Sequence, residues 1–481
     1  MKKCNSLLGL KHSNATSIII LLLSFAFVLF GCSHDKGPNI ILVSIDDLRA
    51  DHLGCYGYSR NTSPNIDSFA KRNIVFKHCY VHEPWTLPSH ISMLTSLYPI
   101  THGVDQRHRL NQDILTLAEV LDNEGYMTMG FVSAGPWMHA KYGFGQGFKI
   151  YRSGKLEETA ADRNAFIGDY LKKYKEEKLF LFIHYFDVHS DANKLPYNAP
   201  PPYENLFSDG YDGNVQDGSG NFSASEYLSY VNEHQIRLKE NDLNYIISLY
   251  DNGIAYMDKC MEDLFDMLKE MDLFDDSLII ITADHGEEFQ EHGYMLHSNP
   301  YYYEEIMHVP LLVKLPKADN HLNGRKREKV VDGLVESIDI MPTILDLIGT
   351  QGPKIQGKSL MGLIDGNEKG KEYVFGFGST GSVFMRSERW KMLNDSGLKE
   401  GRFKLFDLHS DPMEKTNLIG KGLKVEKILK GKLKERMELS QKLRKELLNE
   451  KSVLPDIKDS NKDVSLTEEE KEKLKALGYL Q

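Results

Sequence analysis

Four short apolar runs, separated by helical patterns, constrain the fold of this chain more than any other feature. The run Asn39–Ile45 is almost continuously apolar and ends in two aspartates, which is typical of a strand buried on both faces. Three later runs look the same: Leu179–Tyr185, Ser277–Thr282 and residues 309–314. Helical patterns lie between them, at residues 114–123 and 245–271. This alternation predicts an α/β domain with a doubly wound, mostly parallel sheet flanked by helices.

The C-terminal part of the sequence has a different pattern. Short alternating segments at residues 373–377, 382–386, 390–393 and 403–408 predict a small antiparallel sheet beside the main domain. A Lys- and Glu-rich stretch follows, and its last helix is predicted to open at Thr467 with capping-box spacing. Residues 209–221, rich in Gly, Asp and Asn, indicate an exposed insertion loop. We therefore divide the 481 residues into an N-terminal segment (1–31), a large domain (38–365), a sheet subdomain (366–420) and a charged helical tail (421–481).

The first residues are typical of an export signal. Three lysines, at positions 2, 3 and 11, precede an apolar run at residues 18–30, which is short for a stable membrane span. The Gly31-Cys32 pair that ends the run is similar to a bacterial lipobox, in which the cysteine becomes the lipidated first residue. The alternative is an uncleaved N-terminal anchor. Both interpretations predict an exported, membrane-anchored protein, periplasmic or at the cell surface, held in the first case by a lipid on Cys32.

Net charge and cysteine content argue against several classes of protein. The formal charge is −11, and loss of residues 1–31 would remove three lysines and no acidic residue. Such acidity argues against nucleic-acid binding and against electrostatic adhesion to anionic lipid, so a lipid would have to supply the membrane attachment. Beyond the export segment, Cys55, Cys79 and Cys260 are too scattered for a disulfide framework or a cysteine metal site. We expect them to be small buried hydrophobic residues, with a Cys55–Cys79 bridge as the alternative.

Ligand-type side chains follow three of the predicted strands. Two aspartates follow the first run, histidines at 184 and 189 lie at the end of the second, and an Asp-His-Gly triplet follows the third. In doubly wound sheets, polar residues just past the carboxyl ends of the strands form the functional site. Adjacent carboxylates can also be a helix cap with a surface neighbour. Two such pairs together favour a four-ligand site for a divalent cation, made of Asp46, Asp47, Asp284 and His285, with Gly286 expected to allow a tight turn.

A possible nucleophile lies between the two ligand pairs in the sequence. Pro88 and the helix-competent run after it predict a helix that begins just after Thr86. The dipole and the unpaired N–H groups at such a helix N-terminus favour an anionic substrate. A threonine at this position commonly caps the helix, but beside a metal its hydroxyl can ionise and attack phosphorus or sulfur.

These elements resemble the sulfatase family of the alkaline-phosphatase superfamily. Residues 44–58 are similar to the opening of that family, 88–99 to its nucleophile motif, and 184–189 to its active-site histidine segment. Residues 282–287 are similar to its second metal-ligand segment, and 338–343 and 405–412 to later landmarks. The similarity runs in the right order from about residue 38 to residue 420. It implies a sulfatase-like fold, a divalent metal ion and a hydrolase acting on ester bonds.

The departures from this resemblance concern the nucleophile and its surroundings. Family members that cleave sulfate esters carry Cys or Ser, oxidised to formylglycine, at the position of Thr86, and Arg at the position of His90. The extra methyl of threonine stands in the way of this oxidation, so water or a second alcohol would have to resolve a Thr86 ester. His285 stands where sulfatases often have Asn, and the family's Lys-Trp-His segment has no clear counterpart after Tyr126. The resemblance therefore implies phosphodiesterase-like or phosphoglycerol-transferase-like chemistry.

Our hypothesis from the sequence is an atypical, metal-dependent sulfatase-family hydrolase of sulfate or phosphate esters, with phosphoester cleavage or transfer favoured. One divalent ion (Ca, Mn or Zn, with a second metal possible) would activate the Thr86 hydroxyl. We expect His189 to protonate the leaving oxygen. His297 and His308 are candidates for binding the remaining anionic oxygens or a second metal. His90 completes the catalytic candidates, although any one histidine can be a hydrogen-bonded core residue.

Two other functions stay open at this point. One is an arylsulfatase-like sulfuric-ester hydrolase that acts on sulfated glycans, because fold alone fixes no substrate. The other is a non-catalytic surface protein that keeps the fold and the metal. The substrate is expected to be a small molecule or a glycan or lipid ester, which the sequence does not name.

Overall fold

The computed structural model of the chain describes residues 37–133, 136–154, 158–190, 196–213, 215, 224–297, 302–317, 328–378, 381–394, 402–448 and 467. The predicted export segment, most of the predicted loop at 209–221 and all of the predicted last helix except Thr467 lie outside these residues. The helices and strands of the described residues belong to the unit Pro38–Gln481.

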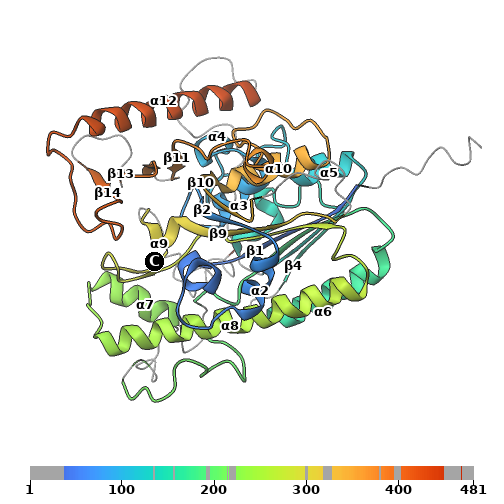
Figure 1. Ribbon diagram of the computed structural model, residues 1–481, viewed down its shortest axis with the longest axis horizontal. Helices are drawn as coiled ribbons and strands as arrows, with labels where there is room; N and C mark the ends of the chain where they lie inside the picture. The colour runs from blue at the N-terminus through green and yellow to red at the C-terminus, as the bar shows by residue number, and fades with distance from the viewer. Residues whose placement is uncertain are drawn as a thin grey trace, which may run out of the picture. The chain divides into compact units, whose positions relative to one another are not determined.

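An eight-stranded sheet forms the centre of this unit (Figure 1), with the strand order β10-β2-β9-β6-β1-β5-β3-β4. The strands β1 (Asn39–Ile45), β5 (Leu179–Tyr185) and β6 (Ser277–Thr282) are adjacent and parallel, with β1 in the middle. They are buried on both faces, which is why their sequences are continuous apolar runs rather than alternating ones. The other strands of the sheet are β2 (Ile74–Tyr80), β3 (Met127–Val132), β4 (Ile150–Ser153), β9 (His308–Lys314) and β10 (Val330–Glu336).

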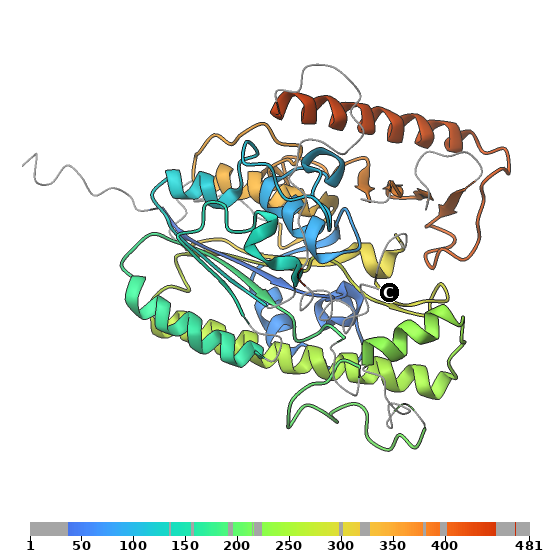
Figure 2. The ribbon, with the colours of Figure 1, turned by 180° about the vertical axis from the view of Figure 1, so that it is seen from behind.

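Helices cover both faces of the sheet (Figures 1 and 2). On one face lie α2 (Pro64–Arg72), α6 (Ala160–Tyr174) and α8 (Glu240–Glu270), and on the other α3 (Thr86–Thr95), α5 (Leu117–Asn123) and α10 (Ile340–Leu347). Shorter helices are α4 (Pro99–His102), α7 (Ala224–Glu233), α9 (Glu304–Met307) and α11 (Met361–Ile364). The predicted fold class, a mostly parallel sheet flanked by helices, is confirmed. None of the helices in the described part of the chain is long and apolar enough to cross a membrane.

One predicted strand runs in the opposite direction. The apolar run at residues 309–314 belongs to β9, which pairs antiparallel with both β2 and β6. Between β6 and β9 the described residues form a two-strand hairpin, β7 (Glu288–Phe289) and β8 (Met295–Leu296), followed by the four-residue helix α9. A parallel return would need a crossover of a dozen or more residues, usually helical, to carry the chain back along the sheet. The expectation that this run resembles the parallel strands was therefore wrong, because an apolar run reports burial and not direction.

The predicted small antiparallel sheet is confirmed. Its strands β11 (Val374–Phe377), β12 (Val383–Arg386), β13 (Trp390–Asn394) and β14 (Phe403–Asp407) pair in sequence order. Helix α12 (Lys424–Leu447) follows and contributes Leu429 and Leu433 to the same apolar cluster as Phe403 and Leu405 (Figure 1). The sheet is thus covered by the charged helix that the sequence predicted to follow it.

The three cysteines behave as expected from their scattered positions. All are free thiols, so the alternative Cys55–Cys79 bridge is not formed. Cys79 and Cys260 are members of the main apolar core, and Cys55 is partly buried against it.

A buried ion-pair group fastens the small sheet to the main domain. Lys391 of β13 is completely buried, and its ammonium lies 3.0 Å from Glu414 Oε1 and 3.1 Å from Glu304 Oε1. The guanidinium of Arg386 of β12 reaches the same Glu304 oxygen at 3.1 Å. Because Glu304 belongs to α9, these contacts link the small sheet to the segment that connects β6 and β9.

Replacing Lys391 with methionine is expected to lower the free energy of unfolding by about 3–5 kcal/mol, because Glu414 would stay buried without its cation. Lys432→Met is the matched control, since it removes only an exposed pair with Glu435 and should change the free energy by less than about 1 kcal/mol. Urea unfolding followed by fluorescence measures both variants. Equal unfolding midpoints for the two would contradict the structural role of Lys391.

Candidate active site

The carboxyl ends of β1, β5 and β6 bring the predicted metal ligands together. In the register of the sheet, Ser44 of β1 lies beside His184 of β5 and Thr282 of β6, so the three strands end at the same level. The two aspartates after β1 and the Asp-His pair after β6 are therefore neighbours in space, although they are more than two hundred residues apart in sequence.

Asp47 has a backbone conformation that is unusual for a residue with a side chain. Its φ is 60°, in the left-handed region, where strain costs about 1–3 kcal/mol and persists only if the surroundings fix it. Two contacts do so: the Asp46 N–H donates to the Tyr185 carbonyl at 2.9 Å, and the Tyr250 hydroxyl donates to the Asp47 carbonyl at 2.7 Å. This fixed turn places the carboxylates of both aspartates beside the Asp-His pair.

The four predicted ligands and His297 form one buried group, the Asp-His cluster. Asp47 Oδ1 lies 2.9 Å from Nδ1 of His285 and 2.9 Å from Nδ1 of His297. On the other side of the His285 ring, Nε2 is 3.3 Å from Asp284 Oδ2 and 3.7 Å from Asp46 Oδ1. The four predicted ligands are completely buried, and His297 is 5% exposed. The structure therefore brings together all four ligands that the sequence predicted.

Several carboxylate oxygens of this cluster lack a hydrogen-bond donor. Within the described residues, no well-directed hydrogen bond reaches Asp46 Oδ1, Asp284 Oδ2 or either carboxylate oxygen of Asp47. Nor does any lysine or arginine of the described residues form an ion pair with these three aspartates, whose close partners are histidines. Uncompensated carboxylates inside a protein fit a bound cation, because their burial is otherwise costly.

The pKa values of the aspartates respond to the same crowding. Burial, and then the charge of Asp47, raise the pKa of Asp46 well above its ordinary value. Burial and the charge of Asp46 raise the pKa of Asp284 in the same direction. Burial would also raise the pKa of Asp47, but His297 and His189 hold it well below the ordinary value. The cluster thus carries more negative charge than its surroundings can stabilise.

The ligand atoms are close enough to share one ion. Asp46, Asp284 and His285 bring one ligand atom each to within 4.8 Å of the others, and so do Asp47, His285 and His297, and also Asp46, Asp47 and His189. These groups overlap in their members, so they surround a common centre. A mixed set of carboxylate oxygens and imidazole nitrogens suits Mn or Zn as well as Ca. The residues present therefore could hold a divalent metal ion.

Thr86 is the first residue of α3, and its side chain does not cap the helix. Its hydroxyl Oγ1 instead lies 3.3 Å from His285 Nε2, at the edge of the Asp-His cluster. One turn later, the Ser89 hydroxyl donates to the Asp284 carbonyl at 2.6 Å and ties the helix to the ligand loop. The common structural role of a threonine at this position is therefore absent, and the hydroxyl faces the cluster.

His90 lies beside the cluster but uses both ring nitrogens for other contacts. Its Nδ1 donates to the Thr86 carbonyl at 2.8 Å, and its Nε2 contacts the Ser44 hydroxyl at 2.9 Å. Burial, and then His184, lower its pKa well below the ordinary value. These contacts connect the first turn of α3 to β1, which makes His90 a positioning residue for Thr86.

His184 is a neighbour of the cluster to which the sequence gave no separate role. Its Nε2 lies 3.0 Å from Asp46 Oδ2 and orients that carboxylate. The signal was present in the sequence, because His184 is the last residue but one of an apolar run. Only the strand register, which sets His184 opposite Ser44, explains why it meets Asp46.

His189 faces the cluster from the loop after β5. Its Nδ1 donates to the Ser190 carbonyl at 2.5 Å, and its Nε2 lies 3.7 Å from Asp47 Oδ2. The ring stacks on Phe186 with centroids 4.1 Å apart. Burial lowers the pKa of His189 to about 4, although Asp47 opposes this shift. The ring is therefore neutral near pH 7 and can accept a proton before it donates one.

Glu287 is a buried acid of the site to which the sequence reasoning gave no role. Its Oε1 lies 3.4 Å from His297 Nδ1, so His297 stands between the carboxylates of Asp47 and Glu287. Burial, and then the charge of Asp47, raise the pKa of Glu287 to about 8. Its place in the segment 282–287 was visible, but nothing in the sequence distinguished it from a surface acid.

Two expectations about neighbouring residues need correction. His308 lies outside the cluster: it begins β9, its Nε2 donates to the Lys77 carbonyl at 2.7 Å, and its ring stacks on Tyr80. Gly286 is required for space rather than for a tight turn. A Cβ there would come within 2.1 Å of the Glu305 carbonyl oxygen.

Comparisons with known proteins agree with this geometry. The sulfatase family model matches residues 38–350, and the model of the N-sulphoglucosamine sulphohydrolase C-terminal region matches residues 290–443. An arylsulfatase of Clostridium perfringens is 26% identical over 450 residues, which cover 79% of this chain and 90% of that protein. A delta 4,5-hexuronate-2-O-sulfatase of Bacteroides thetaiotaomicron is 22% identical, over 82% of this chain and 86% of that protein.

A solved structure extends the comparison to phosphorus chemistry on the same fold. The phosphonate monoester hydrolase of Silicibacter pomeroyi superposes with a TM-score of 0.65 at 21% identity, covering 84% of this chain and 95% of that one. The sulfatase family match contains the eight-stranded sheet and every residue of the Asp-His cluster. The chain therefore belongs to the sulfatase family, within the alkaline-phosphatase superfamily, and is a hydrolase of sulfate or phosphate esters.

Proposed function

We propose that the protein is a metal-dependent phosphoester hydrolase or transferase in which Thr86 is the nucleophile. The observation that carries this proposal is the Thr86 hydroxyl, 3.3 Å from His285 Nε2 and not engaged in capping α3. Threonine is not expected to form formylglycine, because its methyl group stands in the way of the oxidation. A nucleophile that keeps a single hydroxyl favours phosphorus, since sulfatases use the second hydroxyl of the hydrated aldehyde to expel sulfate.

The proposed metal ligands are Asp46, Asp47, Asp284 and His285. A divalent ion held by them would lower the pKa of a hydroxyl bound to it and stabilise negative charge on substrate oxygens. The donor-free carboxylate oxygens of the cluster support one such ion, of Ca, Mn or Zn. Because the groups that could hold a metal share their members, a single ion satisfies them, and the proposal needs no second metal.

The proposed reaction has two steps. Thr86 Oγ1 attacks phosphorus, and a new oxygen–phosphorus bond forms as the bond to the leaving alcohol oxygen breaks. His189 takes the proton of the Thr86 hydroxyl on Nε2 and gives it to the leaving oxygen, because its Nδ1 already donates to the Ser190 carbonyl. Water, or a second alcohol in a transferase, then attacks the phosphothreonine and regenerates the hydroxyl.

Other parts of the site support an anionic substrate. The N–H groups of Thr86 and Leu87 lie in the first turn of α3, where the helix dipole favours negative charge. His297 faces the centre from the hairpin side and is proposed to bind a remaining anionic oxygen or to complete the metal coordination. His90 holds the Thr86 carbonyl and so sets the direction of the nucleophile.

Sulfate-ester hydrolysis is the second candidate function. The relatives from Clostridium perfringens and Bacteroides thetaiotaomicron are sulfatases by name, and one of them acts on a sulfated hexuronate. A non-catalytic metal-binding protein is the third candidate, and it would keep the cluster without turnover. We also propose, from the N-terminal sequence alone, that the protein is exported and lipid-anchored through Cys32.

A panel of aryl esters separates these functions. Aryl phosphate monoesters, aryl phosphate diesters and aryl sulfates are incubated with the full chain in Mn, Zn or Ca, and the released phenol is measured. We expect turnover of at least one phosphate ester at a kcat/KM at least about tenfold above that for aryl sulfate, a difference of about 1.4 kcal/mol in the barrier. Turnover of aryl sulfate alone would contradict the proposal, and no turnover of any ester would favour the non-catalytic alternative.

A further inference from the structure

A cavity beside the β7–β8 hairpin is lined by cations that have no acidic partner. Its volume is about 370 Å³, and its walls come from the hairpin turn, from β14 and from the segment that follows β14. Three basic side chains reach it: Arg237, Lys404 and Lys415.

The hydrogen bonds of these cations go to neutral oxygen atoms. Arg237 Nη1 donates to the Gln290 carbonyl at 2.9 Å, and Lys404 Nζ donates to the Tyr303 hydroxyl at 2.8 Å. Lys415 Nζ donates to the Glu291 carbonyl. Across the described ranges, none of the three basic groups has an ion pair with a carboxylate. Each cation therefore keeps its full charge at the wall of the cavity.

The acidic residues of the same walls are already neutralised from outside the cavity. Glu291 Oε1 lies 2.7 Å from Nη1 of Arg49, and Glu414 Oε1 lies 3.0 Å from Nζ of Lys391. Because these acids have their own cations, the cavity has an excess of positive charge. This is notable in a chain whose formal net charge is −11, where exposed cations without acidic partners are the exception.

The cavity also offers a neutral donor and aromatic surface. Asn417 accepts hydrogen bonds from the N–H groups of Leu405 and Ile419, both at 3.0 Å, through its amide oxygen. Its amide N–H groups are left as donors for a bound oxygen atom. Tyr303 and Phe406 supply the apolar part of the wall.

Two short covalent paths connect this cavity to the Asp-His cluster. His292 at the cavity is five residues from His297 in the cluster, at most about 18 Å along an extended chain. On the other path, Asp47 is two residues from Arg49, whose guanidinium holds the lining residue Glu291. A short oligomeric substrate bound at Thr86 can therefore reach the cavity.

We propose that this cavity binds a second anionic group of the substrate, a sulfate, phosphate or carboxylate, while the ester to be cleaved lies at Thr86. The natural substrate is then a polyanionic ester, such as an acidic oligosaccharide, rather than a simple monoester. Only the position of the cleaved ester rests on the proposed function. The binding of a second anion does not depend on which ester is cleaved.

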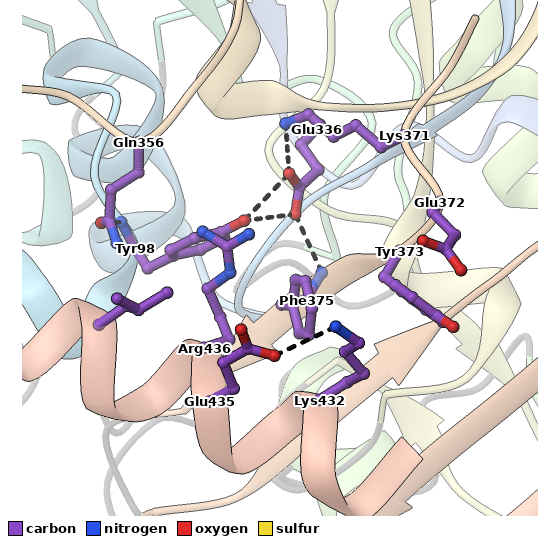
Figure 3. A pocket seen from close by; sticks show the side chains of 11 residues that line it. Tyr98, Glu336, Gln356, Lys371, Glu372, Tyr373, Phe375, Lys432, Glu435 and Arg436 are labelled. Carbon is purple, nitrogen blue, oxygen red and sulfur yellow. Dashed lines mark hydrogen bonds and ion pairs between the residues drawn. The ribbon is translucent and has the colours of Figure 1, made fainter. Parts of the chain in front are cut away.

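A second cavity of the molecule provides the contrast (Figure 3). It has a volume of about 340 Å³ and lies between α12 and the start of the small sheet. Lys371 pairs there with Glu336, and Lys432 pairs with Glu435 at 3.2 Å. The guanidinium of Arg436 stacks over the rings of Tyr98 and Phe375. These paired lysines hold α12 to the main domain, so Lys432 serves as the control for a surface charge outside the proposed subsite.

The test measures binding without turnover. The full chain with Thr86→Val, loaded with Mn, is titrated calorimetrically with a chondroitin sulfate hexasaccharide, which carries several sulfates and carboxylates. The variant Arg237→Gln/Lys404→Gln/Lys415→Gln in the same background is expected to raise the Kd at least tenfold, and the loss should shrink as salt is added. Lys432→Gln in that background should leave the Kd within twofold. Arg237 and Lys415 are exposed, so a double variant of these two alone tests the inference without risk to folding.

Three results would overturn the inference. They are no measurable binding by the parent chain, equal Kd values for the parent and the triple variant, and an equal loss for Lys432→Gln. Turnover of a small aryl phosphate by the triple variant with an otherwise native sequence should match that of the wild type, because such an ester does not reach the cavity. Failure of the proposed function instead appears as a wild-type chain without aryl phosphate turnover, whatever the hexasaccharide does.

Discussion

A Thr86→Val variant is expected to lower kcat on the best ester by about 10³-fold or more, because valine keeps the shape of threonine but has no hydroxyl to attack phosphorus. The Thr86 side chain makes a single described hydrogen-bond contact, to His285, so the fold should be unaffected. Initial rates over a range of substrate concentrations separate kcat from KM, and the loss should appear in kcat.

The matched control for this variant is Thr86→Ser. Serine restores the hydroxyl without the methyl group, so its kcat should stay within about tenfold of the wild-type value, a change of roughly 1.4 kcal/mol in the barrier. If Thr86→Val turned over the ester nearly as fast as the wild type, Thr86 could not be the nucleophile. Equal losses in both variants would point to packing rather than to the hydroxyl.

Removal of the metal is expected to abolish turnover and to lower the thermal stability of the protein. The cluster holds three aspartates whose carboxylates have no lysine or arginine partner among the described residues, so a cation should stabilise the folded state. At a metal concentration one hundred times its Kd, this stabilisation amounts to about 2.7 kcal/mol. Chelation followed by addition of Mn, Zn or Ca, with turnover and melting temperature measured together, checks both effects.

An Asp46→Asn variant sharpens the metal prediction. It removes one buried negative charge beside Asp47 and Asp284, so the chelated variant should melt at a higher temperature than the chelated wild type. Metal should then raise its melting temperature much less than that of the wild type. Asp275→Asn, at an exposed position, is the control and should show the wild-type response. Full turnover after chelation would refute the role of the metal.

The sequence predicted the central strands well for a physical reason. The runs of β1, β5 and β6 are buried on both faces, so their hydrophobicity is continuous and their ends are marked by the first polar residue. The same runs predicted the metal ligands, because strand ends in a doubly wound sheet gather at one edge. The small sheet was predicted from its alternating segments, which reflect a sheet with one covered face.

Other strands could not be recognised in the same way. β2 carries Lys77 and His78 in its middle, and β10 alternates between exposed and buried residues at its start. The direction of β9 depends on what connects it to β6, which the apolar run itself does not contain. These features depend on neighbouring elements rather than on the segment alone.

The finer contacts of the site also depend on the assembled fold. The sequence named His90 and His297 but could not tell that His90 holds the Thr86 carbonyl or that His297 lies between Asp47 and Glu287. It placed His308 with the site, whereas β6 lies between β9 and β1 and keeps that side chain away. Residue type predicts which side chains can bind a metal, but strand order decides which of them meet.

The most direct test of the account is to trap the substituted nucleophile. The metal-loaded chain is mixed with a radiolabelled aryl phosphate, quenched in acid during turnover, digested and mapped by mass spectrometry. We predict one labelled phosphoryl group on the peptide that contains Thr86, and none in the Thr86→Val variant. A turning-over enzyme whose Thr86 peptide stays unmodified at every quench time, or whose label lies on another residue, would contradict the account.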